Sequence, residues 1–139
     1  STIEVNVQGT LRCIYSVLPL MKKQEDGHII NIASVDGKEI FAGGAIYGAS
    51  KAAIIELSKA MRMELSPEFN IRVTAVEPGT VDTNLRDGIT DTELLKNKDY
   101  GGDEPMLDPA KIADAVYYAV SQPASVNVNE LLVKPTGKA

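Results

Sequence analysis

Three polar side chains, Ser34, Tyr47 and Lys51, have the types and the spacing of a proton-transfer site. Tyr47 and Lys51 are four residues apart in an alanine-rich stretch that predicts a helix, so both lie on one helical face. An ammonium beside a phenol favours the phenolate and lowers a phenol pKa that ordinarily lies near about 10. A tyrosine tuned in this way can exchange a proton with a substrate oxygen. Taken alone, this pair most often serves packing and solvation.

The elements expected around these residues alternate strands with helices. Apolar runs predict three strands, over residues 28–34, 71–76 and 129–133. Helical periodicity predicts three helices, over residues 1–23, 45–66 and 109–122, with Pro19 and residues 24–27 marking the end of the first. Ser34 therefore ends a strand and Tyr47 opens a helix. The alternation predicts an α/β fold with a parallel sheet and right-handed crossovers.

Composition limits the classes of function. The chain has 139 residues with 44% apolar side chains and a net charge of −5, which predicts one domain at most and no nucleic-acid partner. No apolar run approaches the roughly 18 residues of a membrane span, and no basic leader precedes one, so we expect a cytoplasmic protein without membrane association. Cys13, the only cysteine, is expected to be a small buried hydrophobe. His28, the only histidine, has no partner at metal-ligand spacing, so no metal site is expected.

The negative charge is concentrated in residues 77–104, which hold eight acidic and three basic side chains. Residues 80–108 are expected to be irregular, with short helices. The acidic stretch is interpreted either as a solvated loop or as a lid over a substrate that is not strongly anionic. One segment can be both.

Five ordered segments match a known family. They are Asn-Val-Gln-Gly at 6–9, Gly-His-Ile-Ile-Asn-Ile-Ala-Ser at 27–34, Tyr-Gly-Ala-Ser-Lys at 47–51, Ile-Arg-Val-Thr-Ala-Val-Glu-Pro-Gly at 71–79, and Val-Asp-Thr at 81–83. Over essentially its whole length, the chain resembles the carboxyl-terminal half of a short-chain dehydrogenase/reductase. The resemblance implies that residues 1–139 form part of a doubly wound, Rossmann-like sheet, with three parallel strands and flanking helices, and that the first half of this fold is absent.

The resemblance implies a role for each matched residue. Tyr47 would be the general acid or base, and Lys51 would assist it and hydrogen-bond the nicotinamide ribose. Ser34 would polarise the substrate carbonyl, and Asn6 would hold a water in the proton relay behind Lys51. The residues implied in cofactor binding are Tyr47, Lys51, Pro78, Gly79, Val81 and Thr83.

The cofactor implied is NADP or NAD, with NADP slightly favoured. The glycine-rich dinucleotide loop of the family does not occur in this chain, because Gly37, Gly43 and Gly44 lie in the loop before Tyr47. The tail at 127–136 resembles a bacterial subgroup that oxidises 3-hydroxy acids such as serine, or reduces small carbonyls, usually with NADP.

The leading hypothesis is an NAD(P)-dependent oxidoreductase that acts on a small alcohol or carbonyl, with the 139-residue chain alone expected to be inactive. The helices at 1–23 and 45–66 are expected to pair copies of the protein into a homo-oligomer, since the second is apolar on more than one side. An alternative from another class is a non-enzymatic oligomeric module without cofactor binding. A weaker alternative is a sugar-nucleotide epimerase or dehydratase, which shares the tyrosine and the lysine but usually carries a longer segment after the lysine.

Overall fold

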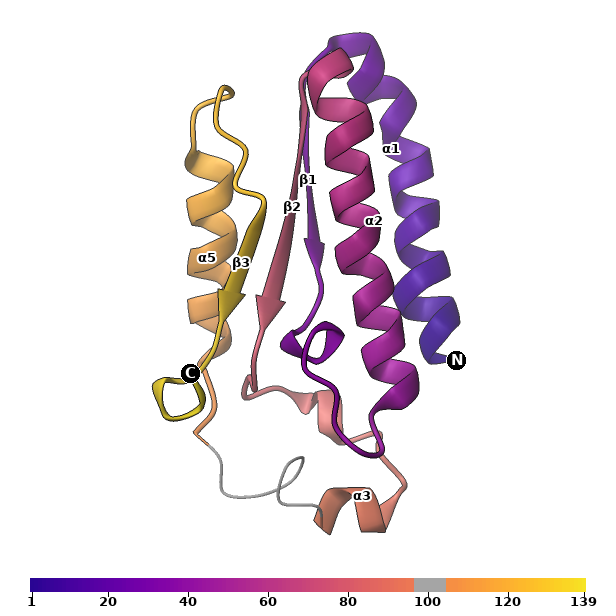
Figure 1. The fold of residues 1–139 in the computed structure, drawn as a ribbon, viewed down its shortest axis with the longest axis vertical. Helices are drawn as coiled ribbons and strands as arrows, with labels where there is room; N and C mark the ends of the chain where they lie inside the picture. Colours follow the sequence, from indigo (N-terminus) through magenta and orange to yellow (C-terminus); the bar gives the residue numbers. More distant parts are fainter. Residues whose placement is uncertain (97–104) are drawn as a thin grey trace.

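Three short apolar segments form one parallel sheet in the computed structural model, which describes residues 1–96 and 105–139 (Figure 1). The strands are β1 (Gly27–Ile32), β2 (Ile71–Pro78) and β3 (Glu130–Val133), in the order β1-β2-β3. Both neighbouring pairs are parallel. This arrangement confirms the predicted α/β fold with three parallel strands. The boundaries differ by one or two residues at a strand end: β1 already ends at Ile32, and β2 continues to Pro78.

Three long helices flank the sheet. They are α1 (Thr10–Gln24), which continues from a π-helical turn η1 (Glu4–Gly9), α2 (Ala45–Phe69) and α5 (Pro109–Ser121). Short helical segments are η2 (Val35–Gly37), η3 (Asn84–Arg86), α3 (Thr92–Lys96) and η4 (Thr136–Lys138). The first long helix ends at Gln24, close to the predicted residue 23, but Pro19 lies inside it and does not mark its end. The cap after Gln24 is Glu25, whose left-handed backbone (φ 50°) closes the last turn of the helix.

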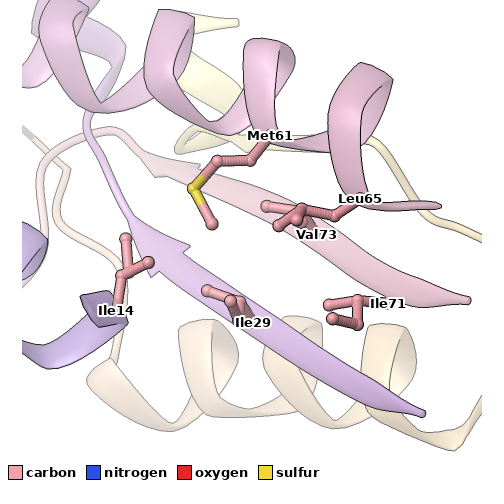
Figure 2. Close-up of a cluster of buried hydrophobic side chains, with 6 residues drawn as sticks. All are labelled: Ile14, Ile29, Met61, Leu65, Ile71 and Val73. Atoms are coloured by element: carbon pink, nitrogen blue, oxygen red, sulfur yellow. The ribbon is translucent and has the colours of Figure 1, made fainter. Parts of the chain in front are cut away.

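The helices cover opposite faces of the sheet. Successive side chains of a strand point to opposite faces, and Val73 of β2 packs with Met61 of α2. The neighbouring Arg72 donates instead to the carbonyl oxygen of Gln122 (3.0 Å), just after α5. Figure 2 shows α2 on one side of the sheet and α5, in pale orange, on the other. The two connections, β1–α2–β2 and β2–α5–β3, each move by one strand in the same direction across the sheet. Because their helices lie on opposite faces, the two connections have opposite hands. The expectation of uniformly right-handed crossovers therefore does not hold.

The main core lies between α1, α2 and the sheet (Figure 2). It consists of Ile14, Ile29, Met61, Leu65, Ile71 and Val73. Ile71 and Val73 are fully buried, so this cluster fixes α2 against β2. The position of α2 decides where Tyr47 and Lys51 lie.

Replacing Met61 with Ala should lower the free energy of unfolding of the whole protein by about 2–5 kcal/mol, because it removes buried apolar surface and leaves a cavity. The matched control is Met63→Ala, two residues along the same helix, where the side chain is 75% exposed against 6% for Met61. We expect the control to change the free energy by less than about 0.5 kcal/mol. Urea denaturation followed by circular dichroism measures both. Equal effects would contradict the position assigned to α2.

The chain has one cysteine, Cys13, and one histidine, His28. Cys13 is exposed on α1, so the expectation of a buried cysteine is wrong. His28 lies in β1 with its Nε2 2.7 Å from Oγ1 of Thr74, and burial together with the charge of Arg72 lowers its pKa. The contact with Thr74 links the side chains of β1 and β2.

The ends of the predicted lid, residues 80–108, lie together. The backbone N–H of Asp82 donates to the carbonyl oxygen of Leu107 (2.9 Å), and the N–H of Leu107 donates to that of Thr80 (2.9 Å). Residues 97–104 fall outside the described part of the chain, so the lid remains a prediction. Among the helices within the described ranges, none combines the length and apolar character needed to cross a bilayer.

Candidate active site

The carboxyl ends of β1 and β2 meet at one edge of the sheet. Ile32 pairs with Val76 in the parallel register, and the N–H of Ala33 donates to the carbonyl oxygen of Val76 (2.7 Å). Ser34 and Pro78 therefore leave the sheet side by side. In open α/β sheets, ligands bind outside this edge.

Ser34 begins a tight turn at this edge. It is 6% exposed and caps the helical turn η2, with its Oγ accepting a hydrogen bond from the N–H of Asp36 (3.1 Å). In this bond the hydroxyl acts as the acceptor, so the bond does not use its O–H group as a donor. Burial, followed by the charge of Glu39, raises the pKa of Asp36.

Tyr47 and Lys51 lie on the first turns of α2, as the spacing predicted. Nζ of Lys51 is 5.6 Å from the centroid of the Tyr47 ring. The same ammonium donates to the carbonyl oxygen of Ile32 at 3.1 Å, which ties it to the end of β1, two residues before Ser34. Burial lowers the pKa of Lys51. A cation held against the ring of a half-buried tyrosine is an arrangement suited to acid–base chemistry.

Close backbone contacts bring the turn at Ser34 onto the same part of α2. A Cβ at Gly48 would lie 2.9 Å from the carbonyl oxygen of Asp36, and a Cβ at Gly37 would lie 2.9 Å from the backbone nitrogen of Ala52. Only glycine allows both approaches. No local pattern indicates the role of Gly48, because the contact depends on a turn twelve residues earlier.

Asn6 reaches the same helix from the other side. It lies in the π-helical turn η1, and its Nδ2 donates to Oγ of Ser50 (3.0 Å). The fully buried Ser50 donates in turn to the carbonyl oxygen of Tyr47 (2.7 Å). Asn6 is thus linked through Ser50 to the backbone of Tyr47. Single π turns occur often at functional sites.

The residues predicted to line the nicotinamide follow the end of β2. The N–H of Gly79 donates to the carbonyl oxygen of Val133 (2.7 Å), and Val81 forms a bridge with Leu107. Thr83 is exposed and caps η3, with its Oγ1 accepting from the N–H of Leu85 (3.4 Å). Pro78 completes this set at the end of β2, at the same sheet edge as Ser34. Contact of these residues with a cofactor remains a prediction.

A hollow on another part of the surface does not coincide with this edge. Its lining residues are Lys59, Arg62, Met63, Ser66, Pro67, Asn127, Asn129 and Glu130. Arg62 within it is occupied by the carbonyl oxygen of Asn129 (2.9 Å). The hollow contains none of Ser34, Tyr47 and Lys51, so we assign it no part in their chemistry.

Comparisons with known proteins agree with the family expected from the motifs. Residues 1–94 match the family model described as short chain dehydrogenase. An uncharacterised oxidoreductase of Staphylococcus saprophyticus is 45% identical over 96% of this chain and 52% of its own length. One from Staphylococcus epidermidis is 43% identical over 96% of this chain and 53% of its own. The chain therefore spans about half the length of the curated relatives it matches.

Solved structures give the same result. Serine dehydrogenase from Escherichia coli is 34% identical, with a TM-score of 0.76 over 96% of this chain and 51% of that one. The closed form of serine dehydrogenase complexed with NADP+ is 33% identical, with a TM-score of 0.85 over 99% of this chain and 55% of that one. The described fold therefore superimposes on about half of each of these enzymes.

Proposed function

Because the chain belongs to the short-chain dehydrogenase family, we propose that the whole protein transfers a hydride between a nicotinamide cofactor and a small alcohol or carbonyl compound. One observation carries the proposal. Lys51 lies against the Tyr47 ring while it donates to Ile32, at the edge where β1 and β2 end. Through these two contacts the ammonium links the Tyr47 ring to the strand end that leads into the turn at Ser34.

Each side chain has a definite task in carbonyl reduction. The hydroxyl of Ser34 donates to the carbonyl oxygen and polarises it. The nicotinamide supplies the hydride when it is bound. Tyr47 gives its phenolic proton to the same oxygen, and the ammonium of Lys51 stabilises the phenolate that results. In alcohol oxidation, Tyr47 takes the proton instead. Asn6 is proposed to hold a water through which the proton site reaches solvent.

The residues at this edge fit the nicotinamide end of the cofactor. An ammonium has three N–H donors, and Lys51 uses one of them on Ile32. The others suit the hydroxyl groups of a ribose. We propose that Pro78, Gly79, Val81 and Thr83 line the nicotinamide from the adjoining strand. The isolated 139-residue chain is expected to lack activity, since it has no glycine-rich turn for the pyrophosphate.

A finer proposal concerns the substrate. The serine dehydrogenase structures resemble this chain at 33–34% identity, and one of them is a complex with NADP+. The tail at 127–136 resembles the same subgroup. We therefore propose a small 3-hydroxy acid as the substrate and NADP, in preference to NAD, as the cofactor.

We also propose that copies of the protein associate through α1 and α2. Both helices expose large apolar side chains that no described element covers, among them Leu11, Leu20 and Ile46. Surfaces of this kind commonly form interfaces. A location in the cytoplasm remains a prediction from the sequence.

The decisive experiment is an assay of the whole protein with NADP+ and NAD+ against small 3-hydroxy acids and simple alcohols, and with the reduced cofactors against small carbonyls. We expect turnover, seen as a change in the absorbance of reduced nicotinamide, and higher kcat/KM with NADP(H). An epimerase would instead interconvert sugar nucleotides without net change in NAD(P)H. Absence of both turnover and NADPH binding would favour the non-enzymatic module and contradict the proposal.

A further inference from the structure

A fully buried carboxylate lies directly beside the candidate site. Glu77 is the penultimate residue of β2, immediately before Pro78, and its side chain is 0% exposed. Burying an unpaired carboxylate is strongly unfavourable. Nζ of Lys38 lies 2.8 Å from Oε2 of Glu77, and among the described residues neither carboxylate oxygen has a well-aligned hydrogen bond. Lys38 is therefore the cation that the structure places beside this buried carboxylate.

Lys38 joins this carboxylate to a second strand. Its Nζ also donates to Oε2 of Glu130, the first residue of β3, at 2.5 Å, and Arg62 of α2 lies 3.6 Å from the other oxygen of Glu130. The carboxylates of Glu130, first, and of Glu77 raise the pKa of Lys38. The ammonium therefore stays charged at neutral pH, and the cluster of two cations and two anions is balanced.

The backbone of Lys38 closes the turn that begins at Ser34. Its N–H donates to the carbonyl oxygen of Val35 (2.8 Å), and the N–H of Gly37 donates to that of Ser34 (3.0 Å). The side chain of Lys38 thus fastens this turn to β2 and β3. The next residue, Glu39, also contacts the β3 region, because Nζ of Lys134, directly after β3, lies 2.9 Å from its carboxylate.

We propose that Lys38 is a positioning residue, whose ion pair with buried Glu77 holds the turn of Ser34 in a fixed place relative to the Pro78–Gly79 end of β2. The ion pair then fixes the Ser34 hydroxyl, which is proposed to bind the substrate, relative to the end of β2, which is proposed to line the nicotinamide. The consequence for catalysis rests on the proposed function. A displacement of about 1 Å in such a site can cost about 100-fold in rate.

The test uses the double variant Lys38→Met/Glu77→Leu in the whole protein. The single variant Lys38→Met would leave Glu77 buried without its cation and could prevent folding, whereas removing both charges avoids that cost. We expect the folded double variant to lose about 10- to 100-fold in kcat, while the KM for the cofactor stays close to that of the wild type. Lys38→Arg keeps a cation beside Glu77 and should retain most of the activity.

The matched control is Lys59→Met. Lys59 pairs with Glu56 at 2.8 Å on the exposed side of α2, so the same substitution there breaks an ion pair that holds no part of the site. We expect its kcat to equal that of the wild type. A loss of kcat equal to that of the double variant would contradict the proposal.

Amide hydrogen exchange gives a measurement that does not need turnover. The N–H groups of Asp36 and Gly37 bond to Ser34, so their exchange should become several-fold faster in the double variant and stay unchanged in Lys59→Met. Unchanged exchange in a folded double variant would overturn the proposal, and so would faster exchange with an unchanged kcat. If the wild type shows no turnover, the proposed function fails, while the exchange rates still decide whether Lys38 holds the turn.

Discussion

Replacing Tyr47 with Phe should lower kcat of the whole protein by about 10²- to 10⁴-fold, the usual contribution of a positioned acid or base. The change removes only the hydroxyl that is proposed to carry the proton. The ring remains, so its contact with the ammonium of Lys51, 5.6 Å from the centroid, is kept. Cofactor-linked turnover measures kcat, and titration of NADPH fluorescence should show nearly unchanged cofactor binding.

The control for this variant is Tyr15→Phe on α1. Tyr15 is 82% exposed, so the loss of its hydroxyl should leave kcat unchanged. A tyrosine that served only for packing would behave in the same way at position 47. If Tyr47→Phe kept wild-type kcat in a protein that turns over substrate, the proposed acid–base role would be wrong, even though the family would stand.

The strands and long helices could be predicted because their signals are local. Apolar runs and helical periodicity are properties of neighbouring residues, and they located β1, α2 and α5 closely. The end of β2 could not be predicted in this way. Glu77 carries a charge, which normally marks the end of a buried strand, yet here it is buried because Lys38 lies beside it. That ion pair joins a residue of β2 to the segment between β1 and α2.

The face of the sheet that α5 covers could not be predicted from the sequence either. An amphipathic helix can cover either face equally well, and the usual right-handed rule favoured the face of α2. The opposite choice is visible in the contact of Arg72 with the carbonyl of Gln122, which links the far face of β2 to the end of α5. No local pattern marks a contact of this range.

The candidate site shows the same difference between local signals and long-range contacts. The placement of Tyr47 and Lys51 on one face of a helix follows from their spacing alone. The link from Asn6 through Ser50 to the backbone of Tyr47 joins residues on two helices, so no local pattern indicated the part that Ser50 plays. Local chemistry is predictable, and the contacts that position it depend on the whole fold.

Replacing Lys51 with Met should lower kcat/KM by about 100-fold or more while the protein stays folded. An ammonium stabilises the phenolate that forms in alcohol oxidation, so the variant should need a higher pH than the wild type to reach its remaining activity in that direction. The KM for the cofactor should rise as well, since the N–H groups proposed to bind the ribose are lost. Rates measured across the pH range in both directions test these effects. Lys59→Met, a change on the exposed side of the same helix, should alter none of them.

The stability of the same variant separates a catalytic lysine from a structural one. Burial lowers the pKa of Lys51 below the ordinary value of 10.5, so the folded protein binds this proton less tightly than the unfolded chain does. The contribution of Lys51 to stability therefore increases as the pH rises through the range between the lowered pKa and 10.5. At neutral pH the buried charge costs stability, and Lys51→Met should be as stable as the wild type or more so in urea denaturation. A variant that lost both activity and stability would contradict this view, because it would show that Lys51 holds the fold together.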